Sequence, residues 1–218
     1  MRTKILMLAL GTLMTSTAQA QSRWFASVQG GYSVSTSTAQ SFPGGGAFGS
    51  SAFIGAQLSP LFTLGAEGGF YGVENTATET SVDCPPPSVP GSLGCTETDR
   101  AELDWIQLGG TLRVGPNEGS VRPYGALGVA VYFGQRDTES TITDGSTGTV
   151  YPGFPLSSNV DRTAVGASFG GGLDWVPRNS SWSVGISARL HALTGGDENG
   201  EYGGDTFVTV LAGVGYRW

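Results

Sequence analysis

Lysine, histidine and long apolar runs are scarce in this sequence of 218 residues. Lys4 is its one lysine, His191 is its one histidine, and the formal net charge is −7. Nucleic-acid-binding proteins gather positive charge on one face or along one helix, so we expect no nucleic-acid partner. Beyond residue 20 no 18 consecutive residues are apolar, which excludes a transmembrane helix from that part of the chain.

Cysteine is also rare, with only Cys84 and Cys95. Two cysteines supply too few ligands for a structural zinc site, and we expect neither a metal nor a cofactor. The segment between the two cysteines contains several proline and glycine residues, which indicates an irregular loop. In an oxidising compartment the simplest interpretation is a disulfide within this loop.

Glycine, by contrast, is abundant. The 36 glycines are more than twice the usual share of about 7%. Glycine destabilises helix interiors, so this composition disfavours a helical protein.

The N-terminus has the pattern of a secretory signal peptide. Arg2 and Lys4 precede a mostly apolar stretch over 5–14, and small residues occupy positions 18 and 20. We predict a signal peptide over 1–20 and a single domain over 21–218. The alternative is a membrane-anchoring helix, but the apolar stretch is shorter than the roughly 20 residues that a helical span needs. Cleavage removes two positive charges and leaves a net charge of −9, from 9 arginines and 18 acids.

The C-terminal segment 208–218 alternates strictly between apolar and other residues. One face of a strand would carry Val208, Val210, Ala212, Val214, Tyr216 and Trp218. Thr209, Gly213, Gly215 and Arg217 would lie on the other face. This pattern is typical of a strand with lipid on one side and a polar lumen on the other.

Seven further segments alternate in the same way. The expected strands are 23–33, 49–58, 61–73, 101–114, 120–133, 161–176, 182–193 and 205–218. Short turns alternate with long polar loops at 34–48, 74–100, 134–160 and 194–204. The pattern predicts an all-β fold, an eight-stranded antiparallel up-and-down transmembrane β-barrel. The alternative is a lipocalin-like barrel or a β-sandwich with its apolar face inside.

Aromatic residues fall at both ends of the expected strands, where membrane proteins place them. Trp24, Phe62, Trp175, Trp182, Tyr216 and Trp218 lie at the end that carries the termini. Tyr32, Phe70 and Phe133 lie at the other end, with Trp105 or Phe207. Strict alternation places Trp105 on the inward face of its strand, away from the aromatic belt. A bulge, or a position at the rim of the barrel, could explain this exception.

The opposite faces of the strands place charged residues inside the barrel. The predicted lumen charge network consists of Glu67, Arg113, Arg122, Asp174, Arg189 and Arg217. Buried charges require partners, so we expect a Glu67–Arg189 pair. We also expect a cluster of Asp174 with Arg122 and with Arg113 or Arg217. The interior of eight strands is just filled by side chains, which favours a plugged core over a narrow ion path.

The long loops hold most of the acidic residues. They are Glu74, Glu79, Asp83, Glu97, Asp99, Asp137, Glu139, Asp144, Asp197, Glu198 and Glu201. A solvated anionic surface is the simpler interpretation, and weak bridging of lipopolysaccharide phosphates by divalent cations is the alternative. The spacing does not match a calcium-binding loop, so no metal site is predicted.

The final residues Val214, Tyr216 and Trp218 resemble the C-terminal assembly signal of bacterial outer-membrane β-barrels. The chain after residue 20 resembles the small barrel superfamily that includes the OmpA transmembrane domain, OmpX and Ail. The resemblance implies an integral protein of the cell outer membrane with an envelope-structural or surface-interaction role in adhesion or protection. It also implies a monomer whose partners are outer-membrane lipid, lipopolysaccharide, the barrel assembly machinery and an extracellular partner reached through the loops.

Two alternative functions remain open from the sequence. One is a small channel of the OmpW kind. The other is a lipid A-modifying enzyme, because His191 shares a strand face with Ser187 and a histidine base needs a nearby nucleophile. Position 193 is leucine, so the His-x-Ser spacing of the lipid A deacylases is missing. We therefore expect no catalytic residues and a non-enzymatic protein.

Overall fold

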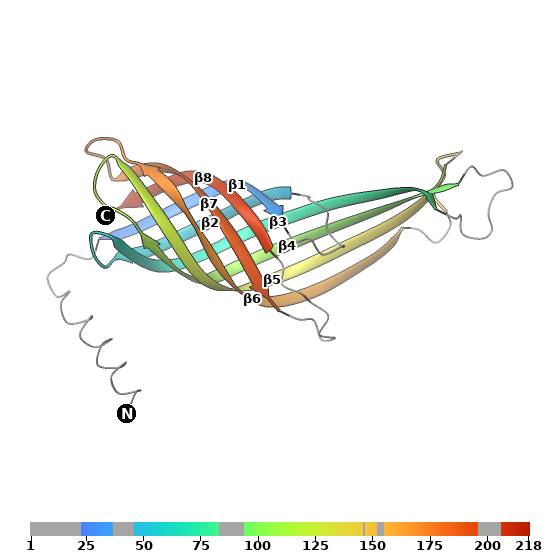
Figure 1. The fold of residues 1–218 in the computed structure, drawn as a ribbon, viewed down its shortest axis with the longest axis horizontal. Helices are drawn as coiled ribbons and strands as arrows, with labels where there is room; N and C mark the ends of the chain where they lie inside the picture. The colour runs from blue at the N-terminus through green and yellow to red at the C-terminus, as the bar shows by residue number, and fades with distance from the viewer. Residues whose placement is uncertain (1–22, 37–45, 83–93, 146, 152–154, 196–205) are drawn as a thin grey trace, which may run out of the picture.

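Eight antiparallel strands form a closed barrel in consecutive order, as Figure 1 shows. The computed structural model describes residues 23–36, 46–82, 94–145, 147–151, 155–195 and 206–218. The strands are β1 (Trp24–Ser35), β2 (Gly46–Gln57), β3 (Phe62–Val82), β4 (Cys95–Val114), β5 (Val121–Asp144), β6 (Leu156–Trp175), β7 (Trp182–Thr194) and β8 (Thr206–Arg217). The predicted all-β up-and-down architecture is confirmed. The predicted signal peptide lies outside the described residues.

The ring closes between the first and last strands. Residues 25–35 of β1 pair with residues 207–217 of β8, so neither strand is left as an edge. Beyond the ladder, the backbone N–H groups of Trp24 and Trp218 each donate to the other residue's carbonyl, at 3.1 and 3.2 Å. Tight turns join β2 to β3, β4 to β5 and β6 to β7 at the end where β1 begins (Figure 1). Short turns are periplasmic in bacterial barrels, which orients the molecule.

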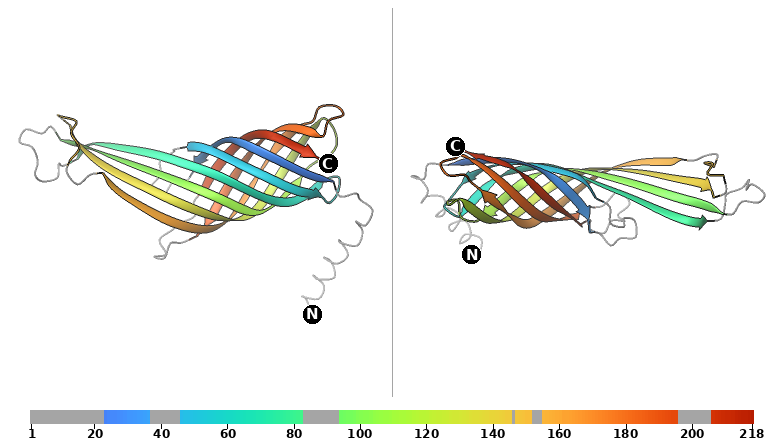
Figure 2. Two further views of the ribbon diagram at one scale, coloured as in Figure 1. Left: turned by 180° about the vertical axis from the view of Figure 1, so that it is seen from behind. Right: turned by 90° about the horizontal axis from the view of Figure 1, so that it is seen from above.

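Four of the strands are much longer than a membrane span requires. Strands β3 to β6 have 20 to 24 residues, whereas β1, β2, β7 and β8 have 12 or 13. A tilted span needs about 9–11 residues. The excess forms a four-stranded sheet that projects past the barrel on the side opposite the tight turns (Figure 2). We call this part the projecting sheet; it comprises 72–82, 95–104, 135–144 and 156–164.

The projecting sheet corrects the prediction that 74–100 and 134–160 are loops. Most of these residues are paired strand, with Thr98 opposite Thr141 and Thr138 opposite Ser158. β-Branched residues favour strands, and pairs of hydroxyl side chains across strands stabilise them, as where the hydroxyls of Thr138 and Ser158 lie 2.8 Å apart. The polar sequence was misleading because water can contact both faces of a sheet outside the bilayer, so no apolar face is needed.

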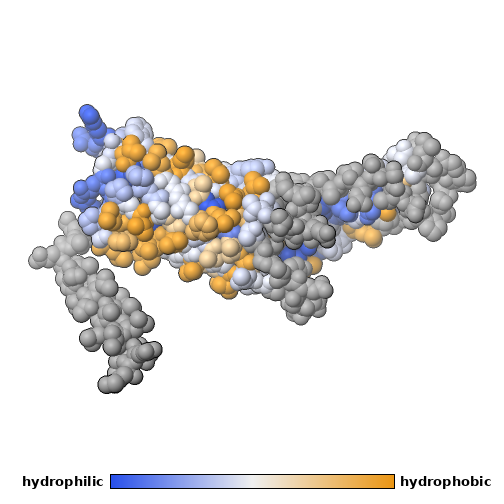
Figure 3. Space-filling view, viewed as in Figure 1, coloured by the Kyte–Doolittle hydropathy of each residue, from blue (hydrophilic) through white to orange (hydrophobic). Residues whose placement is uncertain are grey.

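The outer surface of the barrel is apolar, and the space-filling view shows these side chains gathered over it (Figure 3). Exposed aromatic residues lie at the turn end; they are Trp24, Phe62, Trp175, Trp182, Tyr216 and Trp218. Tyr32, Phe70 and Phe133 are exposed at the other end, together with Phe48, which pairs with Tyr32. Among the described residues, no helix has the length and apolar character to cross a membrane.

Trp105 and Phe207, one of which we expected in the outer aromatic belt, both point into the barrel. Trp105 and Phe207 are only 2% exposed, and the β4–β5 register runs through Trp105 without a bulge. Gly134 is directly opposite Trp105 on β5. A Cβ atom at Gly134 would lie 2.5 Å from the indole ring, so the missing side chain makes room for the tryptophan inside.

Replacing Gly134 should therefore destabilise the barrel. We expect Gly134→Val to lower the free energy of unfolding by about 1–3 kcal/mol, the usual cost of an overpacked core. Urea unfolding in lipid vesicles, followed by tryptophan fluorescence, measures the change. Gly110→Ala is the control, because the nearest atom to a Cβ there lies 3.9 Å away. Equal stability of the two variants would show that the Trp105 site is not tightly packed.

Candidate functional site

The middle of the lumen holds a buried ion pair. Arg189 on β7 donates from Nη1 to Glu67 Oε2 on β3. The hydroxyl of Thr111 on β4 donates to the same carboxylate oxygen at 2.6 Å. All three residues are at most 7% exposed. The structure thus brings together the two residues that strand parity indicated, and a neutral donor completes the site.

A second charged group closes the lumen near the periplasmic end, around Asp174. Arg113 Nη2 lies 3.6 Å from Asp174 Oδ2, and both side chains are about nine-tenths buried. The guanidinium of Arg113 also lies over the ring of Tyr124, 3.7 Å from its centroid. A charge removed from water needs this kind of compensation, because desolvation is costly.

The expected cluster around Asp174 comes together, because Arg113, Arg122 and Arg217 line one small cavity with it, but Arg122 makes its hydrogen bond elsewhere. Asp174 and Arg122 are opposite each other in the β5–β6 register, but Arg122 Nε donates to the carbonyl of Gly119 in the turn at 2.8 Å. Arg217 donates to the Asn117 carbonyl at 2.7 Å. Arg122 lies at the partly exposed rim, where water can solvate it, so the carboxylate pairs with the more deeply buried Arg113.

The outer part of the lumen is filled by aromatic rings around His191. The imidazole is fully buried and stacks on Phe207 with ring centroids 4.4 Å apart. His191 Nδ1 lies 3.0 Å from the Tyr132 hydroxyl, and Nε2 lies 3.3 Å from Thr209 Oγ1. Tyr71 contacts the same imidazole, at 5.0 Å between centroids.

This arrangement does not form a serine–histidine pair. Both ring nitrogens of His191 contact Tyr132 and Thr209, and the Ser187 hydroxyl donates to Gln29 Oε1 at 2.9 Å. A histidine base must reach the hydroxyl that it activates. His191 therefore helps to fill the outer lumen, with its ring nitrogens against Tyr132 and Thr209 and not against Ser187. Within the same described residues, no group of three or more His, Cys, Asp or Glu side chains could hold a metal ion.

Together these side chains form three layers across the lumen: the Asp174 group, the Glu67 group and the His191 group. At the Asp174 group, a residual cavity of about 20 Å³ is lined by Arg113, Asp174 and Arg217. That volume is enough for about one water molecule. The lumen is thus a packed core at the levels that these layers occupy.

The projecting sheet is the second candidate site, and its character is acidic. A groove of about 430 Å³ is lined by residues of β4, β5 and β6, including Arg100, Glu102, Asp137 and Glu139. Asn159 Nδ2 donates to Asp137 Oδ1 at 2.6 Å. At the base of the sheet, partial burial raises the pKa of Asp104, and the negative charge of Asp137 raises it further.

Several acids predicted to lie in loops belong to these strands. Glu97 and Asp99 are on β4, and Asp137, Glu139 and Asp144 are on β5. Glu74 and Glu79 are on β3. Asp83, Asp197, Glu198 and Glu201 lie outside the described residues, as does Cys84. Its predicted partner Cys95 is 1% exposed and disulfide-bonded.

The proposed assembly-signal residues lie on the outer face of β8. Val214, Tyr216 and Trp218 are 44%, 38% and 55% exposed. The rings of Tyr216 and Trp218 stack with centroids 5.9 Å apart. Their exposure agrees with the alternation that predicted them, while a role in assembly remains a proposal.

The Glu67–Arg189 pair generates a stability prediction. Arg189→Leu leaves the carboxylate buried without its cation, so we expect a loss of about 3–5 kcal/mol in the free energy of unfolding. Adding Glu67→Leu should recover much of this loss. Urea titration of the single and double variants in vesicles measures both changes. Arg178→Leu, in an exposed turn, is the control, and a double variant no more stable than Arg189→Leu would contradict the pairing.

Comparison with solved structures finds other small barrels. Neisserial surface protein A matches over 89% of this chain and 97% of its own, at 10% identity and a TM-score of 0.50. The protein Ail of Yersinia pestis matches over 89% and 99%, at 16% identity and a TM-score of 0.43. The N-terminal barrel domain of OprF from Pseudomonas aeruginosa matches over 90% and 97%, at 16% identity and a TM-score of 0.39. Such low identities inform only about fold.

No curated protein matches the chain significantly. The family model described as "Outer membrane protein beta-barrel domain" matches residues 5–217, nearly the whole sequence. With the closed ring of eight strands and its apolar outer surface, this match shows that the chain belongs to the outer membrane protein beta-barrel domain family and resides in the outer membrane.

Proposed function

We propose that this outer-membrane protein is a non-enzymatic surface barrel that contacts an extracellular partner through its projecting sheet. The observation that carries the proposal is the length of β3 to β6, which continue well past the point where β2 and β7 stop pairing with them. A membrane anchor alone has no use for these additional residues. They hold a stiff, hydrogen-bonded surface away from the bilayer.

The edge of β6 is the part of this surface best suited to a partner. Pairing between β6 and β7 ends at Val165, and among the described residues no strand pairs with the outer edge of 156–164. Leu156 and Val160 on this edge are 58% and 41% exposed. An open strand edge offers backbone donors and acceptors to an extended peptide, and neighbouring side chains provide selectivity.

Charge indicates what kind of peptide would fit. The groove beside this edge has three carboxylates, from Glu102, Asp137 and Glu139, and one guanidinium, from Arg100. A basic, extended segment would complement it. A second copy of this chain would place the same acidic groove against itself, which like charges oppose. We therefore propose a polypeptide partner with basic side chains.

Binding of a synthetic probe tests the proposal. We expect a labelled peptide of alternating lysine and valine to bind the protein in nanodiscs more tightly than one of alternating glutamate and valine. Glu139→Lys should weaken this binding about five- to tenfold, because it replaces attraction with repulsion. Fluorescence anisotropy measures both.

The control is Glu118→Lys, which makes the same charge change in an exposed turn at the opposite end. It should leave binding unchanged. Equal effects of the two substitutions would mean that the peptide senses only net charge. Absence of binding by the unmodified protein would contradict the proposed surface.

The alternative functions make different predictions. Three packed layers in the lumen favour a closed barrel over a channel of the OmpW kind, so we expect no discrete conductance steps in planar bilayers. Regular openings by the purified protein would contradict the closed lumen. The lipid A-modifying alternative requires that lipid A from producing cells differ in mass between the wild type and His191→Ala, and we expect identical spectra.

A further inference from the structure

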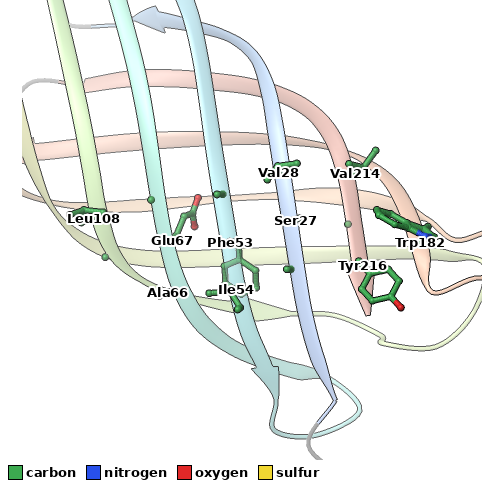
Figure 4. A pocket seen from close by; sticks show the side chains of 15 residues that line it. Ser27, Val28, Phe53, Ile54, Ala66, Glu67, Leu108, Trp182, Val214 and Tyr216 are labelled. Carbon is green, nitrogen blue, oxygen red and sulfur yellow. The ribbon is translucent and has the colours of Figure 1, made fainter. Parts of the chain in front are cut away.

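The bilayer-facing wall of the barrel is hollowed on one side. A groove of about 580 Å³ crosses the outer faces of β1, β2 and β3, as Figure 4 shows in close-up. Its floor consists of the small residues Ala26, Ala52, Ala66 and Gly68. Larger apolar side chains stand above this floor, among them Val28 and Ile54, which are about half exposed.

The groove runs from one level of the membrane to another. Trp182 and Tyr216 lie at one end of it and Leu108 at the other (Figure 4). Trp182 and Tyr216 belong to the periplasmic aromatic belt, and their rings are in contact at 4.9 Å between centroids. Leu108 is next to Gln107, whose side chain is buried in the middle of the lumen. Because strands tilt by about 35–45°, a path across them rises from the periplasmic interface toward the bilayer centre.

The surroundings specify the chemistry of what fills this groove. It opens onto hydrocarbon, and its wall is almost entirely apolar. A void there would forfeit dispersion contacts along its length, and a flexible hydrocarbon chain can fill it. The indole N–H of Trp182 and the phenol of Tyr216 can hydrogen-bond to polar groups at the interface.

We propose that the groove holds one acyl chain of a phospholipid from the periplasmic leaflet, retained longer than the surrounding bilayer lipid. A periplasmic-leaflet lipid has its headgroup beside Trp182 and Tyr216 and its chain directed toward Leu108. Lipopolysaccharide has its headgroup in the opposite leaflet, so its acyl chains would approach the groove from the Leu108 end, away from Trp182 and Tyr216. The inference concerns the membrane-embedded wall and is independent of the projecting sheet and of peptide binding.

The outer face of β5 and β6 also has small residues, Gly125 and Gly171, which are opposite each other, but most of its side chains are larger. On β5 and β6 the corresponding outer face carries Leu127, Phe169 and Leu173, which are 59%, 56% and 42% exposed. This difference between the two sides of one barrel provides an internal control.

Native mass spectrometry of the full-length protein, extracted from outer membranes in mild detergent, tests the proposal. We expect one retained phospholipid per barrel in the wild type. Ala52→Phe fills the floor and should reduce the retained fraction at least fivefold. Ala188→Phe, on the exposed outer face of β7 and outside the groove, should retain the lipid as the wild type does. Heat-modifiable electrophoresis checks that both variants are folded.

A second measurement needs no substitution. A phosphatidylethanolamine with a diazirine on its acyl chain, incorporated into vesicles with the unmodified protein, should crosslink mainly to β1, β2 and β3. Equal labelling of β5 and β6 would overturn the proposal. So would loss of all lipid from the wild type, retention of lipopolysaccharide instead, or a dimer that Ala52→Phe dissociates, which would assign the groove to a second copy.

Discussion

Pairing of the backbone in hydrocarbon is the constraint on which the rest of this structure depends. An unpaired N–H or C=O group costs several kcal/mol in the bilayer core, so a sheet that crosses it must have no edges. The pairing of β1 with β8 removes the last two edges. Once the ring is closed, alternation along each strand assigns every side chain to lipid or to lumen, and the composition of both surfaces follows.

The lumen shows what closure demands of the side chains. Its width leaves room for side chains and little else, so charges inside it must be compensated by protein groups. Glu67 has Arg189 and Thr111, Asp174 has Arg113, and the imidazole of His191 lies among aromatic rings. Where the strands leave the bilayer the constraint ends, and over 156–164 no strand in the described parts of the chain pairs with the outer edge of β6.

Residues inside the bilayer could be placed from the sequence, because lipid imposes a period of two. That period located the eight strands, the outward Val214 and Tyr216, and the inward Glu67 and Arg189. The same period places Trp105 inward, where Gly134 opposite it makes room for the ring. The projecting sheet was missed because water on both faces imposes no period. Choosing Arg113 over Arg122 as the partner of Asp174 required the conformations of long side chains, which strand parity does not contain.

Hydrogen exchange in lipid nanodiscs, read at individual amides, tests the central claim most directly. The account predicts strong protection along the β1–β8 seam, equal to that of the neighbouring pairs inside the bilayer. Every second amide of 156–164 should exchange rapidly, because one side of that strand meets water. Rapid exchange along 25–35 and 207–217 would show that the ring is open and would contradict the account.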